Sequence, residues 1–287
     1  MKNFLIVTNP SKDPELEVTN RIKKHIEEQG GTAAIKERVA TDGEVREIKL
    51  EEMQNDIDCV IVLGGDGTMI RVARDMTGSP IPIFGVNLGT LGYLCEVEAD
   101  HALEAVDRIF SGDYGIEDRM MLVGQAHVDK RSYHPHNALN DIVVYRAGNL
   151  QVVSLDVYIN GKFLCNYFSD GLIVATPTGS TAYNMSAGGP IVDPKAEMIL
   201  ITPINAQAMS AKTVVVSSTD VVEIVVKDRN NNKDQDCVEI AFDGDNIARL
   251  KVGERIVIRK ADECSKFLKM SKLSFIERLE KKMNGYR

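Results

Sequence analysis

Residues 58–68 read Asp-Cys-Val-Ile-Val-Leu-Gly-Gly-Asp-Gly-Thr, an apolar run that passes directly into a glycine-rich turn. Residues 58–63 have the length and composition of a buried strand. The pattern from Met69 to about Met76 predicts a helix directly after the turn, and residues 81–86 predict the next strand. A strand, a turn, a helix and a second strand in this order are typical of a parallel sheet with helices on its faces.

The same alternation continues on both sides of this segment. Residues 4–7 predict a first strand, and residues 15–29 predict a helix that ends at Gly30. After the strand at residues 81–86 come a glycine-spaced loop, residues 87–93, and a helix that Asp100 can cap. We therefore predict an N-terminal α/β domain with a Rossmann-like parallel sheet over residues 1–118.

From Arg119 onward, short β-branched runs dominate the sequence. They are residues 142–145, 152–159, 163–168, 172–175, 213–217, 221–226, 238–242 and 255–259. The pairs Asn160-Gly161 and Asp243-Gly244 predict hairpin turns, and residues 230–232 predict a solvated hairpin tip. We therefore predict an all-β domain, a β-sandwich, over residues 119–273. A C-terminal helix within residues 274–287 is expected to pack back on the N-terminal domain.

The composition excludes several classes of protein. The net charge is −8, the opposite sign from a protein that coats nucleic acid. No apolar run approaches the roughly 18 residues of a membrane-spanning helix, and the run that follows Met1 is too short for a signal-peptide core. The five cysteines contain no Cys-x-x-Cys pair, which disfavours a zinc site and a disulfide framework. We expect a cytoplasmic protein that binds neither nucleic acid nor membrane.

The glycine-rich turn, residues 64–68, has the features of a phosphate-binding loop. Glycine N–H groups can approach a phosphate closely, and the N-terminus of the next helix adds positive potential. The turn matches neither the Walker motif nor the dinucleotide fingerprint. Asp66 would repel a phosphate unless its carboxylate binds a cation or takes up a proton. The alternative is a plain turn with Asp66 as N-cap, but five such residues after a buried strand favour function.

Residues 170–186 form a second candidate segment. Hydroxyl side chains cluster at Thr176, Thr178, Ser180 and Thr181, and Tyr183 adds an aromatic ring. Such hydroxyls suit ribose and phosphate oxygens, and a tyrosine ring suits the face of a base. A polar loop that caps a helix beginning near Tyr183 explains the segment equally well. The glycines at residues 188 and 189 favour a close approach of the backbone to a ligand.

Two shorter groups of polar residues are less specific. Asn140 and Asp141 precede a predicted strand, and their side chains suit an adenine edge and ribose hydroxyls. A β-turn explains this pair more simply when it is taken alone. His134 and His136 lack a third ligand at a suitable spacing. We therefore predict no metal-binding side chains and interpret the histidines as part of an exposed loop.

Together these segments resemble the NAD kinase family. The resemblance rests on residues 64–68, 87–94, 140–141 and 169–190, and in order and spacing it covers essentially the whole chain. Diacylglycerol kinases, sphingosine kinases and 6-phosphofructokinase share the glycine–aspartate motif. The run Thr-Pro-Thr-Gly-Ser-Thr-Ala-Tyr at residues 176–183 is far more specific.

The resemblance implies phosphoryl transfer from ATP, another triphosphate or polyphosphate to the 2′-hydroxyl of the adenosine ribose of NAD, giving NADP. Mg²⁺ would bridge the donor phosphates. The resemblance implies that Asp66 is the catalytic base, that the Gly67 amide faces phosphate and that Arg71 is a charge partner. The other substrate-binding residues that it implies are Tyr93, Asn140, Asp141, Asp170, Thr178, Thr181, Ala182, Tyr183, Ser186, Asn205 and Asp245.

The chain departs from the family pattern at three places. Asn205-Ala206-Gln207 stands where Cys-Pro-His or Phe-Pro-His is common, and Lys212-Thr213 stands where Arg-Pro is common. Phe168 replaces a basic residue that is frequent two positions before Asp170. By the resemblance, these positions would serve a subunit contact or a phosphate contact, and the departures leave the chemical residues in place. The loss of charge at position 168 predicts weaker discrimination for a phosphorylated nucleotide.

The resemblance also implies a homodimer or homotetramer, with an active site between the two domains. Two other functions stay open. A non-catalytic sensor of NAD or NADP on the same fold predicts binding without turnover, and the intact Asp66 disfavours it. A lipid kinase would need a membrane-facing apolar or basic patch, and the net charge of −8 disfavours that.

Overall fold

The computed structural model describes residues 1–37, 40–41, 44–45, 56–89, 92–128, 131–148, 151–208, 211–228, 237–271 and 273–284. The chain divides into two compact units, one of residues 1–118 with 265–287 and the other of residues 119–264. The boundaries fall inside two long strands, β8 (Gly115–Val128) and β20 (Arg255–Lys269). The predicted fold class, α/β followed by an all-β sandwich and a C-terminal helix, is confirmed.

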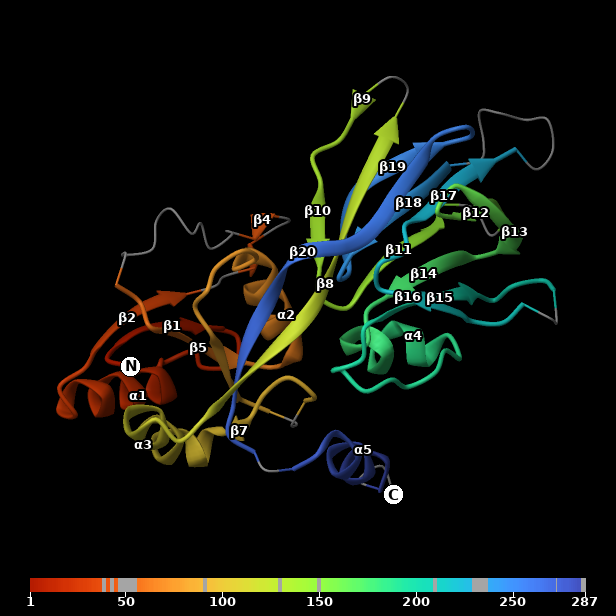
Figure 1. Ribbon diagram of the computed structural model, residues 1–287. Helices are drawn as coiled ribbons and strands as arrows, with labels where there is room; N and C mark the ends of the chain where they lie inside the picture. Colours follow the sequence, from red (N-terminus) through yellow and green to blue (C-terminus); the bar gives the residue numbers. More distant parts are fainter. Residues whose placement is uncertain are drawn as a thin grey trace. The chain divides into compact units, whose positions relative to one another are not determined.

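The first unit is built on a parallel sheet with helices packed on it (Figure 1). Its strands lie in the order β2 (Thr32–Glu37), β1 (Asn3–Thr8), β5 (Cys59–Gly64) and β6 (Ile83–Asn87), all parallel. All six residues of β5 are buried, which is why residues 59–63 are continuously apolar rather than alternating. The short strand β7 (Val97–Glu98) extends the sheet beside β6. The strands β3 (Ala40–Thr41) and β4 (Glu44–Val45) form a separate antiparallel pair.

Three helices of this unit have one apolar side turned to the sheet. Helices α1 (Glu17–Glu28) and α3 (Ala102–Ser111) pack into one core cluster with the buried side chains of β1, β5 and β6. Helix α2 (Asp66–Asp75) contacts β5 and β6. Leu268 at the end of β20 and Met270 just after it belong to the same core cluster as α1 and α3. The last helix, α5 (Phe275–Asn284), follows this segment.

Three expected helix starts differ in the structure. Helix α2 begins at Asp66 rather than Met69, so the end of the glycine turn already forms the first helical turn. The N-cap position belongs to Gly65, which excludes Asp66 as the cap. Asp100 does not cap α3, because it lies inside a short 3₁₀ helix, Ala99–His101, that precedes it. Helix α1 begins two residues later than expected, at Glu17.

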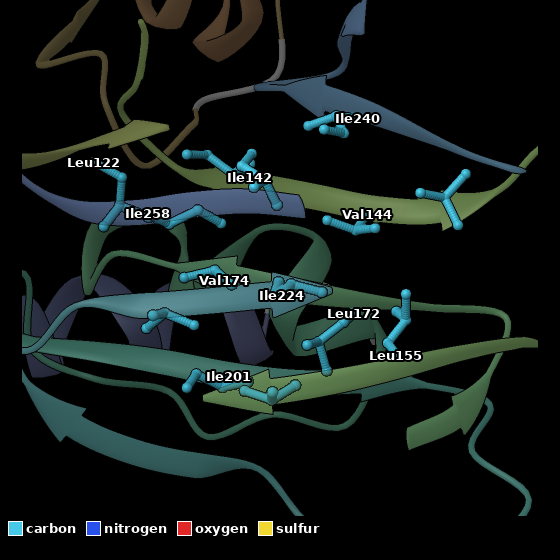
Figure 2. Packing of buried hydrophobic residues seen from close by; sticks show 14 of the residues in the cluster. Leu122, Ile142, Val144, Leu155, Leu172, Val174, Ile201, Ile224, Ile240 and Ile258 are labelled. Atoms are coloured by element: carbon cyan, nitrogen blue, oxygen red, sulfur yellow. The ribbon is translucent and has the colours of Figure 1, made fainter. Parts of the chain in front are cut away.

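The second unit is a sandwich of antiparallel sheets. One sheet has the order β16 (Val214–Ser217), β15 (Met198–Ile204), β14 (Gly171–Ala175), β11 (Asp141–Arg146), β18 (Cys237–Phe242) and β19 (Asp245–Lys251). The other contains β13 (Lys162–Ser169), β12 (Val153–Ile159), β17 (Val222–Lys227) and β20, with β8, β9 (Arg131–Ser132) and β10 (His136–Ala138) joined to it. Figure 2 shows the core between them, with Ile142 and Val144 of β11 among its members.

Both predicted hairpin turns of this unit are confirmed. Asn160 and Gly161 have φ angles of 50° and 74°, and Asp243 and Gly244 have φ angles of 49° and 88°. These left-handed conformations suit asparagine, aspartate and glycine. The predicted tip at residues 230–232 lies outside the described residues.

Candidate functional site

A pocket of about 700 Å³ opens on the outer face of the β16–β19 sheet. Side chains of β11 alternate between this pocket and the sandwich core: Val143 and Tyr145 line the pocket, whereas Ile142 and Val144 lie in the core. The lining is rich in polar groups. It consists of Asn140, Asp141, Val143, Tyr145, Arg146, Asp170, Ala182, Tyr183, Ile204, Asn205, Ala241, Asp243, Gly244 and Asn246. This size and mixture are usual for a small-molecule site.

The carboxylate of Asp243 positions the start of β11. Its oxygens accept backbone N–H bonds from Leu139 at 2.8 Å, Asn140 at 2.7 Å and Asp141 at 3.1 Å. The Asp243 N–H in turn donates to the carbonyl oxygen of Asp141 at 3.0 Å. The left-handed backbone at Asp243 turns the side chain toward these amides. The side chains of Asn140 and Asp141 are therefore presented from a rigid strand end.

Asp141 is a buried acid beside a second acid. Its side chain is 5% exposed, and burial first, then the negative charge of Asp243, raise its pKa from 3.8 to about 7. A carboxyl group of this kind exchanges a proton near neutral pH. Perturbed groups of this kind concentrate in functional sites.

Asp170 is held between two other pocket residues. Its Oδ1 lies 3.0 Å from Nε of Arg146, and its Oδ2 accepts a bond from the Asn205 amide at 3.0 Å. Asn205 adopts a left-handed φ of 47°. The departure from the family pattern at position 205 therefore lies in the pocket itself. Phe168 is 44% exposed and does not line the pocket, whereas Arg146 supplies a cation there.

Most hydroxyl side chains of residues 176–181 bond to the backbone behind the pocket and do not line it. The Thr176 hydroxyl donates to the carbonyl oxygen of Leu139 at 2.6 Å, and the Ser180 hydroxyl donates to that of Val192 at 3.1 Å. A Cβ at Gly179 would lie 2.1 Å from the carbonyl oxygen of Asn140, so only glycine fits there. The segment is therefore packed directly against the residues that Asp243 orients.

The sequence motifs did not reveal the role of Asn184 within this segment. Its side chain is fully buried, and its amide donates to the carbonyl oxygens of Ser180 and Pro190. Its Oδ1 accepts the Thr202 hydroxyl at 2.6 Å. Helix α4 (Tyr183–Ser186) begins where the sequence predicted it, and Tyr183 is 45% exposed at the pocket.

In the first unit, the carboxylate of Asp66 is oriented by a neighbouring loop. Its Oδ2 accepts the N–H of Tyr93 at 2.6 Å, and its Oδ1 accepts that of Leu94 at 3.1 Å. A Cβ at Gly92 would lie 1.8 Å from Oδ1, so the loop can approach the carboxylate only because residue 92 is glycine. Gly67 is exposed in the first turn of α2, with no atom within 4 Å of a would-be Cβ.

Helix α5 is bonded to the loop that orients Asp66. The Glu96 side chain is 1% exposed and pairs with Lys269 and with Arg278, whose Nη2 is 3.0 Å from Glu96 Oε1. Arg278 also donates to the carbonyl oxygen of Cys95 at 3.2 Å, and the Lys282 ammonium lies 4.1 Å from the centre of the Tyr93 ring. Burial would raise the pKa of Glu96, but the two cations bring it below its usual 4.5.

The predicted site residues thus fall into two groups. Asp66, Gly67, Arg71 and Tyr93 belong to the first unit, and the others belong to the second. Six of the second group line the pocket: Asn140, Asp141, Asp170, Ala182, Tyr183 and Asn205. Thr178, Thr181, Ser186 and Asp245 are not among the lining residues. The sequence interpretation missed Asp243, Arg146 and Asn246, which do line it.

Within the described part of the chain, the side chains form no group of three or more histidines, cysteines or acidic residues able to hold a metal ion. Helices long and apolar enough to cross a membrane are likewise absent from it.

Comparison with known proteins gives the family. The model of the ATP-NAD kinase N-terminal domain matches residues 4–114, and that of the ATP-NAD kinase C-terminal domain matches residues 139–270. An NAD kinase of Agathobacter rectalis is 48% identical over 287 residues, which is 100% of both chains. The chain belongs to the NAD kinase family. The resemblance predicted from the motifs is thereby confirmed, and the activity that follows from membership is phosphorylation of NAD.

A further NAD kinase sequence agrees with this assignment, and two solved structures share the fold. An NAD kinase of Lachnoclostridium phytofermentans is 39% identical, over 98% of this chain and 99% of that one. The crystal structure of yeast NADH kinase complexed with NADH has a TM-score of 0.84 at 23% identity, over 99% of this chain and 88% of that one. An NAD kinase from Archaeoglobus fulgidus in complex with ATP has a TM-score of 0.73 at 23% identity, over 94% of each. These structures share the fold of this NAD kinase.

Proposed function

We propose that this NAD kinase binds NAD in the pocket of its second unit and phosphorylates the 2′-hydroxyl of the adenosine ribose, giving NADP. The observation that carries the proposal is the Asn140–Asp141 strand end, which Asp243 holds through three backbone bonds at the pocket wall. Amide and carboxyl side chains in fixed positions suit the polar edge of a base and the hydroxyls of a ribose. The yeast NADH kinase with NADH is a relative in fold that binds a similar dinucleotide.

Individual roles in this pocket follow from their chemistry. Tyr183, half exposed at the pocket, offers a ring face to the adenine. The carboxyl group of Asp170 is oriented by Arg146 and Asn205, so its oxygens are suited to accept hydrogen bonds from an amino group or a hydroxyl. Thr178, Thr181, Ser186 and Asp245 would then act by supporting the wall. The 2′-hydroxyl as acceptor makes the enzyme a phosphotransferase with an alcohol group as acceptor.

We propose that Asp66 is the catalytic base. Tyr93 and Leu94 each donate one backbone bond to it, which leaves lone pairs on both oxygens for a substrate hydroxyl. Its position in the first turn of α2 also puts it beside exposed glycine N–H groups that suit the phosphates of ATP. The NAD kinase of Archaeoglobus fulgidus, solved with ATP, supports ATP as the donor. Arg71, one turn along α2, would act as a charge partner.

A divalent cation such as Mg²⁺ fits this arrangement as a companion of ATP. Mg²⁺ commonly binds through one or two carboxylates together with substrate phosphates and water. Asp66 is the carboxylate of the glycine turn, and the described residues gather no larger cluster of metal-binding side chains. The ion would neutralise charge on the donor phosphates.

We also propose that the enzyme is a homodimer or homotetramer in the cytoplasm. Exposed apolar side chains support an assembly: Phe163 and Phe168 are 58% and 44% exposed on β13, which ends the strand order of its sheet. All five cysteines are free thiols, as in a reducing compartment. Light scattering after size-exclusion chromatography tests the oligomeric state.

The test of the proposed function is a coupled assay. Purified protein is incubated with NAD, ATP and Mg²⁺, and NADP is measured with an NADP-specific dehydrogenase. Asp66→Asn should lower kcat by at least about a hundredfold, since general base catalysis contributes this much. Asp100→Asn, which changes an exposed acid of the same unit, should leave the rate unchanged. Binding of NAD without formation of NADP from ATP or polyphosphate would favour the sensor instead.

A further inference from the structure

The glycine turn lies where the chain changes direction across the parallel sheet. The chain passes from β1 to its neighbour β2 and later returns to β5 on the other side of β1. Open α/β sheets bind ligands outside the carboxyl ends of the two strands at such a point. Here the loops that leave those ends are residues 9–16, after β1, and the glycine turn, after β5.

The first of these loops brings an ammonium group to the glycine turn. The Nζ atom of Lys12 lies 3.0 Å from where a Cβ would stand on Gly65 and 3.7 Å from where one would stand on Gly89. Lys12 also acts on Cys95: burial and the charge of Asp66 raise the pKa of that thiol to about 12, and Lys12 opposes this rise. The ammonium of Lys12 therefore lies close to the same turn as Asp66.

The backbone around Lys12 is firmly bonded. The N–H groups of Lys12 and Asp13 donate to the carbonyl oxygen of Asn9, whose own N–H donates to Leu63 at the end of β5. The Asp13 side chain is buried and accepts bonds from the N–H and hydroxyl of Thr19 in α1. The loop is thus tied to both β5 and α1, which places Lys12 before any ligand arrives.

Within the described part of the chain the ammonium lacks a partner, although its surroundings are polar. Among the residues that the structure describes, none forms an ion pair or a side-chain hydrogen bond with Lys12. The N–H groups of Asp66 and Gly67 also have no acceptor within the described chain. Asn87, 2% exposed and two residues before Gly89, has an Oδ1 atom without a hydrogen-bond partner. A cation and unpaired amides suit an anion, and the Asn87 oxygen suits a hydroxyl group or a bound water.

We propose that Lys12 binds the phosphate chain of the phosphoryl donor against the Gly65–Gly67 turn. This rests on the proposed function, in which the donor occupies the glycine turn. A lysine ammonium is a strong point-charge ligand for phosphate. Its anchored loop brings that charge to the turn without a conformational change. Lys12 thereby supplies the positive charge that the Walker lysine supplies in P-loop enzymes, from a different strand end.

The test measures donor binding separately from turnover. Equilibrium binding of ATP and of inorganic tripolyphosphate is measured by calorimetry for wild type, Lys12→Met, Lys12→Arg and Lys24→Met. Lys24 is the matched control, because its exposed side chain pairs with Glu28 on the surface of α1. Lys12→Met should weaken binding of both probes at least about tenfold and leave the KM for NAD within about twofold. Lys12→Arg should recover a large part of the affinity.

Two outcomes would overturn the proposal. One is ATP binding by Lys12→Met within about twofold of wild type. The other is an equal loss of affinity in Lys12→Met and Lys12→Arg together with a lower unfolding temperature in both, which would make Lys12 a structural residue. Asp66→Asn is assayed in parallel to keep the two proposals separate. If Asp66→Asn loses turnover while Lys12→Met binds the probes as wild type does, the kinase mechanism stands and the role of Lys12 is rejected.

Discussion

Asp141 places a carboxyl group in a buried environment next to the charge of Asp243. Because its pKa is raised from 3.8 to about 7, the folded chain binds a proton at this site more tightly than the unfolded chain does. The free energy of unfolding should therefore fall as the pH rises from about 4 to about 7, and stay level above that. The same proton exchange would change the hydrogen bonds that Asp141 offers to a ribose near neutral pH.

Replacing Asp141 with asparagine should remove this pH dependence. Between pH 5 and pH 8, wild type should lose stability relative to Asp141→Asn by an amount on the order of 2 kcal/mol. Urea unfolding at the two pH values measures the difference. Asp100→Asn, at an exposed acid, controls for loss of a carboxyl group in general. Parallel pH profiles for wild type and Asp141→Asn would show that Asp141 titrates normally.

Asp243 and Asp245 lie two residues apart but differ in their contacts. An amide at position 243 would direct its NH₂ group toward one of the backbone N–H groups that the carboxylate now accepts. Asp243→Asn should therefore raise the KM for NAD about tenfold and lower the free energy of unfolding by about 1–3 kcal/mol. Asp245→Asn, outside the pocket lining, should change both much less. Larger effects of Asp245→Asn than of Asp243→Asn on the KM and on stability would favour Asp245, the residue that the family resemblance implied.

The residues of the site could be predicted only where a motif is local. Asn140, Asp141, Asp170 and Tyr183 stand in short motifs, and all four line the pocket. Asp243 has no such signal, because its role depends on a left-handed backbone and on amides about a hundred positions earlier in the chain. Hydroxyl side chains are also ambiguous in sequence, because the same residue types can bind a ligand or a backbone carbonyl. The hydroxyls of Thr176 and Ser180 donate to backbone carbonyls.

At the scale of elements, α5 bonds to the loop whose backbone N–H groups orient the Asp66 carboxylate. Arg278 bonds to the carbonyl of Cys95 and to Glu96, and the preceding residues Tyr93 and Leu94 donate to Asp66. Arg278→Met would leave the buried Glu96 with Lys269 as its remaining cation, so it should lower the free energy of unfolding by about 1–3 kcal/mol. It should also lower kcat, because the loop no longer holds Asp66 as firmly.

Denaturant unfolding and the NADP assay measure these two effects. Lys281→Met, on the same helix, has none of the contacts of Arg278 and should be close to wild type in both. A variant at 278 with normal kcat but lower stability would confine α5 to a structural role.

The sequence predicted continuous apolar strands well and the less regular strands poorly. Strand β5 is buried throughout and was found. Strand β15 was missed, since Pro203 interrupts its apolar run although it pairs with Leu172. Strand β19 was missed because its sequence, Asp-Asn-Ile-Ala-Arg-Leu-Lys, is mostly polar. Strand β8 begins at Gly115 and contains Gly124, which weakens the pattern.

At the scale of the whole molecule, the first unit is built from two separate segments of the chain, whereas the second is one continuous segment. The first unit takes residues 1–118 and then residues 265–287, and the second takes the segment between them. Leu268 and Met270, 1% and 5% exposed, belong to the core cluster of the first unit although they come near the end of the chain. An N-terminal unit that ended at residue 118 would therefore lack part of its own core.

A fragment of residues 1–118 should consequently fail to fold cooperatively, because the apolar surface that Leu268 and Met270 cover would face water. The same fragment joined by a flexible linker to residues 265–287 should give a cooperative urea transition by circular dichroism. In the full chain, Leu268→Ala should lower the free energy of unfolding of the first unit by about 2–5 kcal/mol. Leu273→Ala, at a side chain that is 40% exposed, is the control and should cost far less. Cooperative unfolding of residues 1–118 alone would show that the C-terminal segment only lies on a finished core, and Leu268→Ala would then have little effect.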